Sequence, residues 1–499
     1  MGAGKSTLAV EAGALLGVPV HDADAEIEAR LGEPIAALFA RAGEPAFRAA
    51  EEEVCLELLD PARGPAVIAL GGGALDSARV RDALAAHVVV HIDVDADTAW
   101  ERAQGGERPL ARDRAAFGAL LRARQGGYAA AADVTLPGSD IRIIAGACDS
   151  LRAALSAPER LPALLWATSM SGDYPVWIGE GALSGAPWPL PEASRRFVVS
   201  DAHVAELYAG GVPGLHGLVE IPAGEEHKTL ATCERVWRSL AEQGVTRADH
   251  LVAVGGGVVG DLAGFAAAAY QRGIPVVQVP TTLVAQVDSA YGGKTGIDLP
   301  EAKNYVGAYH QPAGVLVDPA VLATLPAAEL AAGYAEVVKT ALIAGGALWD
   351  TVATGAGVDL AVIRGCAWTK LGVVAQDERD GGRRQVLNLG HTVAHALETV
   401  TGYARLRHGE AVALGLLAAL RLSGQDALRA QVAGLLEHAG LPVGIDGVDA
   451  DAVLAATRRD KKRTGDHVPF VLCDGPGAVR TGAQVADADV RAAVAELIG

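Results

Sequence analysis

Three stretches of this sequence combine residue types that bind phosphates or metals. Residues 1–7 read MGAGKST, and a G-K-[ST] run that opens a helix surrounds nucleotide phosphates with backbone N–H groups, a lysine and a hydroxyl. Residues 255–261 read GGGVVGD, a glycine-rich turn in which the backbone can approach a pyrophosphate. His391 and His395 are four residues apart, so on a helix they share one face and could bind one metal ion.

The elements that must position these residues alternate between helical patterns and short apolar runs. Strands are expected at 66–70, 88–92 and 133–136, then at 197–200, 250–254 and 275–279. After Pro326 strand signals nearly vanish and helical periodicity runs almost to the end. The expected fold is α/β, in four segments: a parallel α/β domain at 1–155, a linker at 156–173, a second α/β domain at 174–325 and a mostly helical domain at 326–499.

Composition limits the class of protein. A chain of 499 residues is too long for one hydrophobic core, and its net charge of −18 argues against a nucleic-acid surface. Five scattered cysteines without a CxxC pair indicate buried thiols in a reducing cytoplasm. No apolar run approaches the ~18 residues of a membrane helix, and no signal sequence is evident. We therefore expect a cytoplasmic protein that binds neither membranes nor nucleic acid.

Several motifs follow one another in the first segment: the phosphate loop, DAD at 22–24, FR at 47–48, GGG at 71–73, RPL at 108–110, and Arg124 four residues before Tyr128. In this set and order they resemble shikimate kinase, which implies a P-loop kinase-like domain at 1–155. The resemblance implies ATP- and Mg²⁺-dependent phosphorylation of shikimate to shikimate 3-phosphate. The implied ATP site comprises Gly2, Gly4, Lys5, Ser6 and Thr7, the Mg²⁺ site Ser6 and Asp22, and the shikimate site Asp24, Arg48, Gly71, Gly72, Gly73 and Arg124. Lys5 and Arg108 would neutralise charge on the transferring phosphoryl group.

The phosphate loop is shorter than its full pattern. In GxxxxGK[ST] the first glycine would fall two residues before Met1, and the strand that should precede the loop is missing. Loss of that strand would leave two open ladder edges in the sheet. Either the natural chain starts further upstream, which we favour, or the kinase is damaged. Gly126 and Gly127 also depart from the usual pattern beside Arg124.

A second series of motifs runs through the rest of the chain: PAGEEHK at 222–228, the turn at 255–261, PTT at 280–282, VDSAYGGKTG at 287–296, KN at 303–304, AEVVK at 335–339, DER at 377–379, Arg384 and Asn388, GHTVAH at 390–395, RHGE at 407–410 and DKK at 460–462. With these motifs the chain resembles 3-dehydroquinate synthase from about residue 174 to 485. This resemblance implies an α/β NAD-binding domain at 174–325 and a mostly helical metal- and substrate-binding domain at 326–499. Tyr291 and the segment 298–302 (DLPEA) depart from the pattern and leave the substrate preference slightly open.

The resemblance implies conversion of the sugar acid phosphate DAHP to 3-dehydroquinate and phosphate, with NAD oxidising and later reducing C5. NAD would be held by Glu225, Lys228, Gly256, Gly257, Asp261, Thr281 and Thr282. Zinc or cobalt would be held by Glu336, His391 and His408, with His395 an acid/base or substrate contact rather than the ligand that spacing alone suggests. The remaining implied site residues are the cations Lys294, Lys303, Lys339, Lys370, Arg384, Lys461 and Lys462, and the hydrogen-bonding Asp288, Asn304 and Asn388. A homodimer through this half is also implied.

Several alternatives stay open. A related sugar phosphate cyclase, such as an inosose or valiolone synthase, would share the fold, and a metal-dependent polyol dehydrogenase would have a similar architecture. The first segment could instead be a non-catalytic module that stabilises the synthase. Four charged residues count against that role, because a site that has lost its catalytic function has no need of those charges together: Lys5, Asp24, Arg48 and Arg124.

Overall fold

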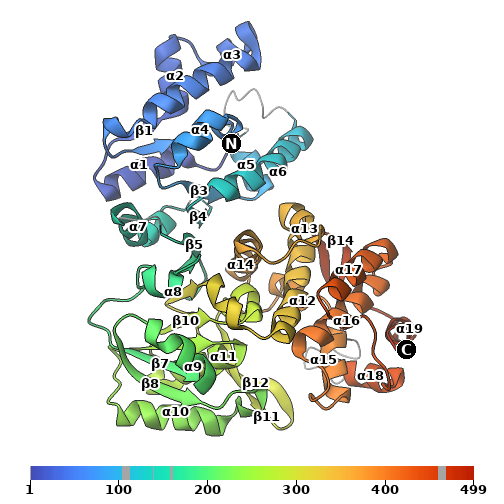
Figure 1. Ribbon diagram of the computed structural model, residues 1–499. Helices are drawn as coiled ribbons and strands as arrows, with labels where there is room; N and C mark the ends of the chain where they lie inside the picture. Colours follow the sequence, from blue (N-terminus) through green and yellow to red (C-terminus); the bar gives the residue numbers. More distant parts are fainter. Residues whose placement is uncertain (1, 104–112, 139, 158–160, 459–467, 499) are drawn as a thin grey trace. The chain divides into compact units, whose positions relative to one another are not determined.

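The structure, a computed structural model, describes residues 2–103, 113–138, 140–157, 161–458 and 468–498. The chain divides into two compact units (Figure 1). Unit 1 holds Met1–Thr168 and Pro175–Trp177, and unit 2 holds Ser169–Tyr174 and Ile178–Gly499. No helix among the described residues is both long and apolar enough to cross a membrane.

Unit 1 alternates strands with helices, as its sequence pattern predicts. Its helices are α1 (Lys5–Leu16), α2 (Ala23–Leu31), α3 (Ile35–Leu58), α4 (Ala78–Leu84), α5 (Ala96–Ala103), α6 (Arg114–Ala131) and α7 (Ile141–Ser156). Its strands are β1 (Val20–Asp22), β2 (Val67–Ala69), β3 (Val90–Asp93), β4 (Val134–Pro137) and β5 (Ala163–Ala167). The three strands predicted in this segment are confirmed within two residues at each end.

The strands of unit 1 form two separate parallel groups. Val20 pairs with Val67 in the β1–β2 sheet, whereas β4 lies between β3 and β5. Among the described strands, β1 is the only partner of β2, and β4 is the only partner of β3. In the described residues β2 and β3 therefore each have one edge without a paired strand. The predicted linker at 156–173 is wrong for residues 163–167, because this apolar run is long enough to form the strand β5.

The first half of unit 2 is built on a parallel sheet with the strand order β13-β10-β9-β7-β8. The strands of this half are β7 (Arg196–Asp201), β8 (Leu215–Ile221), β9 (His250–Gly255), β10 (Val276–Pro280), β11 (Lys294–Leu299), β12 (Ala302–Tyr309) and β13 (Gly314–Val317). In β6 (Tyr174–Ile178) the residues Pro175–Trp177 belong to unit 1, and the two end residues belong to unit 2. Its helices are α8 (Ala182–Gly185), α9 (Ala202–Tyr208), α10 (Leu230–Glu242) and α11 (Gly257–Ala269). The β11–β12 pair is an antiparallel hairpin beside this sheet. Helix α11 buries Leu262, Ala263 and Ala266 against β7 and β9, which fixes the glycine-rich turn at its start.

The second half of unit 2 is helical, as predicted, and appears in yellow to red in Figure 1. Its helices are α12 (Ala327–Ala344), α13 (Gly346–Val352), α14 (Leu360–Gln376), α15 (His391–Val400), α16 (His408–Leu422), α17 (Asp426–His438), α18 (Ala450–Thr457) and α19 (Asp487–Ala495). The structure adds the hairpin β14 (Phe470–Gly475) and β15 (Ala478–Ala483), which helical periodicity did not predict. Its turn contains Gly475 and Gly477, both with positive φ, and its apolar run is too short to identify a strand by periodicity.

Candidate active sites

Two histidines and a glutamate from three helices meet in unit 2. Glu336 lies in the middle of α12, while His391 and His408 are the first residues of α15 and α16. Oε1 of Glu336 is 3.6 Å from Nε2 of His391 and 3.4 Å from Nε2 of His408. One ligand atom from each residue lies within 4.8 Å of the other two. A carboxylate and two imidazoles suit a divalent metal such as zinc and leave coordination positions for substrate oxygens.

The Nδ1 atom of each of these two imidazoles lies near a hydrogen-bond acceptor that orients the ring. Nδ1 of His391 is 3.2 Å from the carbonyl of Leu389, and Nδ1 of His408 is 3.4 Å from Oε1 of Glu398. An acceptor at Nδ1 places the proton there and leaves Nε2 as the ligand atom. Burial disfavours the charged His408 ring, but Glu336 and Glu398 outweigh it and raise its pKa to about 10. Metal binding must displace that proton, so metal affinity is expected to fall as the pH falls.

His395 lies beside the metal cluster but is not one of the three residues whose ligand atoms lie within 4.8 Å of one another. Its ring centroid lies 5.5 Å from that of His391 and 6.2 Å from that of His408. His395 lines the same cavity as both rings. This position fits the acid/base or substrate role implied by the resemblance better than the ligand role suggested by spacing.

A buried group of charges adjoins the metal cluster. Nζ of Lys339 is 2.7 Å from Oδ2 of Asp288 and 2.5 Å from Oε2 of Glu336, and Lys370 also bonds to Asp288. Burial opposes the ammonium charge of Lys339, but the two carboxylates outweigh burial and raise its pKa. Burial likewise opposes the charge of Asp288, but the two lysines hold its pKa well below the ordinary value. Lys339 and Asp288 therefore stay charged at neutral pH and hold each other in place.

The predicted dinucleotide turn lies at the carboxyl end of β9. Gly256 precedes the first turn of α11 and has no side chain to cap it, so its N-terminal N–H groups are available to a phosphate. A Cβ on Gly256 would lie 2.8 Å from Cγ2 of Thr282, which explains the requirement for glycine. Thr281 and Thr282 follow directly after β10, the neighbouring parallel strand. The carboxyl ends of adjacent parallel strands thus bring these residues together.

Lys228 connects several of the predicted NAD residues. Its ammonium is 2.7 Å from Oδ2 of Asp261 and 2.6 Å from Oδ1 of Asn304, with Oε1 of Glu225 at 3.7 Å. Burial works against its charge, but Asp261 and Glu225 raise the pKa of Lys228 overall. Asn304 holds a left-handed backbone (φ 54°), and its N–H donates to Asp298 at 2.7 Å. Lys228 therefore ties the β11–β12 hairpin to α11.

One cavity of about 1560 Å³ joins these groups within unit 2. Its lining includes most predicted site residues of this half, namely Glu225, Lys228, Gly256, Gly257, Asp261, Thr281, Thr282, Asp288, Lys294, Lys303, Asn304, Glu336, Lys370, Asn388, His391, His395 and His408. Lys294 contacts Asp380 at 2.6 Å, and Lys303 lies 3.6 Å from Glu398. The arrangement can hold a dinucleotide, a metal and an anionic substrate side by side.

Two predicted residues lie behind the cavity wall rather than on it. Lys339 is buried between the two carboxylates described above. Arg384 is 1% exposed and donates to the backbone carbonyls of Gly292 and Glu378, so it supports the wall of the cavity. The sequence could not show this, because its motif fixes neighbours in the chain and not side-chain direction. Lys461 and Lys462 lie outside the described residues.

The phosphate loop of unit 1 has the expected helical start. Gly2 and Gly4 have left-handed φ values of 69° and 78°, and α1 begins at Lys5. The hydroxyl of Ser6 donates to Oδ2 of Asp22 at 2.5 Å, while Oδ1 of Asp22 accepts the N–H of Asp24. This places the two predicted Mg²⁺ residues in contact. Thr7 is the third residue of the same helix.

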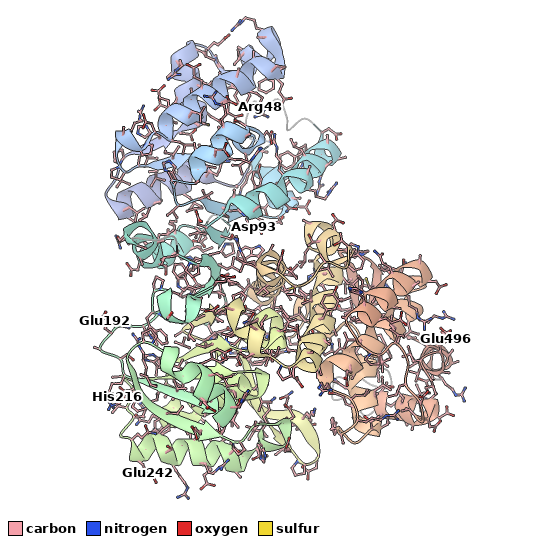
Figure 2. The ribbon with its side chains drawn as sticks, in the orientation of Figure 1. Arg48, Asp93, Glu192, His216, Glu242 and Glu496 are labelled. Carbon is pink, nitrogen blue, oxygen red and sulfur yellow. The ribbon has the colours of Figure 1, made fainter. Side chains whose placement is uncertain are left out.

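The predicted shikimate residues gather around the GGG turn. Arg48, labelled in Figure 2, lies 2.5 Å from Oε2 of the buried Glu51. A Cβ on Gly73 would lie 2.0 Å from Nη1 of Arg48, and one on Gly71 would lie 2.1 Å from Oε1 of Glu51. Burial raises the pKa of Glu51, although Arg48 opposes this. The turn is therefore glycine because an ion pair occupies the space beside it.

The second predicted carboxylate clamp lies on α6. Arg124 contacts Asp76 at 2.5 Å, and the hydroxyl of Tyr128 donates to the carbonyl of Gly72 at 2.5 Å. Arg124 and Tyr128 are four residues apart, so one helix face meets the glycine turn. Arg108 lies outside the described residues.

Two buried carboxylates in these sites, Glu51 and Glu398, belong to none of the motifs found in the sequence. Glu51 is three residues after Arg48 on α3, and Glu398 is seven residues after His391 on α15. Both spacings return to the same helix face as a predicted site residue. That periodicity was the available signal for each of them.

Comparison with family models finds matches in both units. Residues 218–332 match the N-terminal model of 3-dehydroquinate synthase, and residues 333–463 match its C-terminal model. Residues 1–145 match the shikimate kinase model.

Individual relatives agree with the family models. The 3-dehydroquinate synthase of Halorhodospira halophila is 44% identical over 339 residues, which cover 64% of this chain and 95% of that protein. That of Caulobacter vibrioides is 44% identical over 338 residues, 61% of this chain and 90% of that protein. A 2-epi-5-epi-valiolone synthase from Streptomyces hygroscopicus subsp. jinggangensis, solved with NAD⁺ and Zn²⁺ bound, is 28% identical with a TM-score of 0.59, over 65% of this chain and 96% of that one.

Proposed function

We propose specific roles for the two active sites of this chain, which belongs to the 3-dehydroquinate synthase family and carries a shikimate kinase domain before the synthase. Unit 2 converts DAHP to 3-dehydroquinate and phosphate. This activity is supported above all by one observation: Glu336, His391 and His408 line the same cavity as the dinucleotide turn and several lysines.

When bound, NAD would take up and return a hydride, and zinc or cobalt would polarise a substrate oxygen. Glu336, His391 and His408 would hold the metal, and the start of α11 with Thr281, Thr282 and Lys228 would hold the dinucleotide. Lys294 and Lys370 supply positive charge for the phosphate and carboxylate of the substrate, and His395 is placed to move a proton. Asn388 and Asn304 offer hydrogen bonds to substrate hydroxyls.

Substrate choice separates this proposal from a related cyclase. The purified chain, loaded with Zn²⁺ and NAD⁺, is given DAHP or glucose 6-phosphate, and the products are identified by mass spectrometry. We expect 3-dehydroquinate from DAHP and no turnover of glucose 6-phosphate. A cyclised product from glucose 6-phosphate alone would favour an inosose synthase instead. The 44% identity to 3-dehydroquinate synthases, against 28% to the valiolone synthase, supports DAHP.

For unit 1 we propose ATP-dependent phosphorylation of shikimate. The ion-paired Arg48 and Arg124 at the glycine turn and the Ser6–Asp22 contact at the phosphate loop support it. Shikimate-dependent formation of ADP tests the activity. Its absence in a folded chain, with DAHP turnover intact, would favour the alternative of an inactive module.

The proposed setting is the cytoplasm, because all five cysteines are buried and unpaired. A homodimer through the synthase half rests on the family resemblance. Light scattering on the purified chain tests it, and a monomeric mass would contradict it.

A further inference from the structure

Glu398 is a buried carboxylate to which the proposed chemistry gives no role. It lies on α15, two helical turns after His391, and is 3% exposed. A buried carboxylate is costly unless other groups compensate its charge. The structure provides two such partners, His408 and Lys303.

The first partner is a member of the metal cluster. Oε1 of Glu398 is 3.4 Å from Nδ1 of His408, and Nε2 on the opposite side of that ring is 3.4 Å from Oε1 of Glu336. The ring therefore stands between two carboxylates. A carboxylate at the outer nitrogen of a metal-binding histidine fixes its tautomer and its orientation.

The second partner is Lys303 on the β11–β12 hairpin. Its Nζ is 3.6 Å from the same Oε1 of Glu398 and 4.7 Å from the centre of the Tyr403 ring. The N–H of Tyr403 donates to the carbonyl of Glu398 at 2.8 Å, which holds the ring beside the lysine. One carboxylate oxygen thus connects the metal cluster with the hairpin that lines the dinucleotide side of the cavity.

We propose that Glu398 is a positioning residue that holds His408 in its metal-binding orientation and ties Lys303 of the hairpin to the same site. Glu398 acts through these two neighbours and not on the substrate. The inference rests on the proposed metal site, so its test measures metal binding separately from turnover.

The test is a competition between the full chain and a chromophoric chelator for Co²⁺, without substrate. We expect Glu398→Gln to bind Co²⁺ about 10- to 100-fold more weakly than the wild type and to shift the visible absorption of the bound ion. Glu398→Asp, which keeps the charge but has shorter reach, should fall between the two. Glu437→Gln is the matched control, because Glu437 is exposed on α17, and its affinity should equal that of the wild type.

Lys303→Met separates the two contacts of Glu398. It should leave the affinity for Co²⁺ as in the wild type and raise the KM for substrate. NAD⁺ binding of the Glu398 variants, measured by fluorescence, should be unchanged if the fold is intact.

If the Glu398→Gln variant binds Co²⁺ with the affinity of the wild type, and the bound ion has the same visible absorption, the inference is wrong. Should that variant fail to fold, Glu398→Asp decides the question, with weaker Co²⁺ binding supporting the inference and unchanged binding overturning it. A wild-type chain that binds no Co²⁺ would instead contradict the proposed metal site itself.

Discussion

At the scale of single residues, the site depends on charges that are buried together. Lys339 is 1% exposed and lies between Asp288 and Glu336. Removing one member of such a group leaves the others buried without compensation, which destabilises a protein more than loss of an exposed pair does.

Lys339→Met should therefore lower the free energy of unfolding of unit 2 by about 3–5 kcal/mol in metal-free protein. Urea denaturation followed by tryptophan fluorescence measures it. Lys294→Met is the control, because Lys294 is half exposed in its pair with Asp380 and should cost less than about 1 kcal/mol. Equal destabilisation by the two variants would contradict the argument.

A second residue-scale prediction concerns His250, which is fully buried at the start of β9. Nε1 of Trp188 donates to its Nε2 at 3.0 Å, and its Nδ1 lies 2.7 Å from the hydroxyl of Ser194. Burial lowers the pKa of His250 to about 4; Arg196 adds to this and Asp249 opposes it. The ring is therefore neutral in the folded protein, with both nitrogens bonded.

Between pH 6.5 and pH 4 the unfolded chain binds a proton at His250 that the folded chain does not. Stability from this group is present above about pH 6.5 and is lost as the pH falls towards about 4, by up to about 3 kcal/mol. Urea denaturation at several pH values tests this prediction. His250→Gln should remove that part of the slope, and an unchanged slope in the variant would contradict it.

At the scale of elements, a close crossing of two helices determines how far apart the predicted metal ligands His408 and Glu336 lie. A Cβ on Gly409, next to His408, would lie 1.9 Å from the carbonyl oxygen of Ala332 on α12, the helix that carries Glu336. Backbone atoms cannot rotate away as a side chain can, so a larger residue must move α16 away from α12.

Gly409→Ala should thus separate His408 from Glu336 and weaken Co²⁺ binding by about 10-fold or more. Chelator competition measures the loss. Gly434→Ala, on an exposed face of α17 with no atom within 4 Å of the added Cβ, should bind Co²⁺ as the wild type does. Native affinity in Gly409→Ala would show that the crossing does not fix the ligands.

The glycine turn of unit 1 gives a parallel prediction. Gly73→Ala should push Arg48 away from Glu51 and raise the KM for shikimate by about 10-fold, the effect of one misplaced charged contact. Gly126→Ala, exposed within α6 with no atom within 4 Å, should leave KM unchanged and stabilise the helix by about 0.5–1 kcal/mol. Steady-state kinetics with shikimate distinguish the two, and equal KM values would contradict the role of the turn.

The sequence predicted the elements best where apolar runs had one clear period. β9 and β10 are buried throughout and β7 is buried up to Asp201, and their apolar runs indicated strands directly. The run of β5 was misjudged because proline and polar residues flank it, and the β14–β15 hairpin because a turn of glycines interrupts a short apolar run. Strand pairing across the chain supplies stability that local patterns do not contain.

At the scale of the whole molecule, the two sets of site residues belong to different units. The cavity that holds the metal cluster is lined by unit 2, and Lys5 belongs to unit 1. Lys5→Ala should therefore reduce phosphorylation of shikimate by about 100-fold or more and leave DAHP turnover unchanged. Paired assays on one preparation check this, and a parallel loss of both activities would contradict independent sites.

The site was only partly predictable from the sequence, because part of it depends on tertiary packing. Motifs identified Glu336, His391 and His408, although they come from three helices far apart in the chain, because a resemblance carries spatial information that spacing lacks. The buried position of Arg384 and the link from His408 through Glu398 to Lys303 arise from tertiary packing. No local pattern specifies which way those side chains point.

The most direct test of the account is phosphate release from DAHP by the purified chain after removal of metal, with NAD⁺ present. We expect no release until Zn²⁺ or Co²⁺ is restored, and then one phosphate for each 3-dehydroquinate formed. Release at the full rate without metal, or none from a folded chain loaded with metal and NAD⁺, would contradict it.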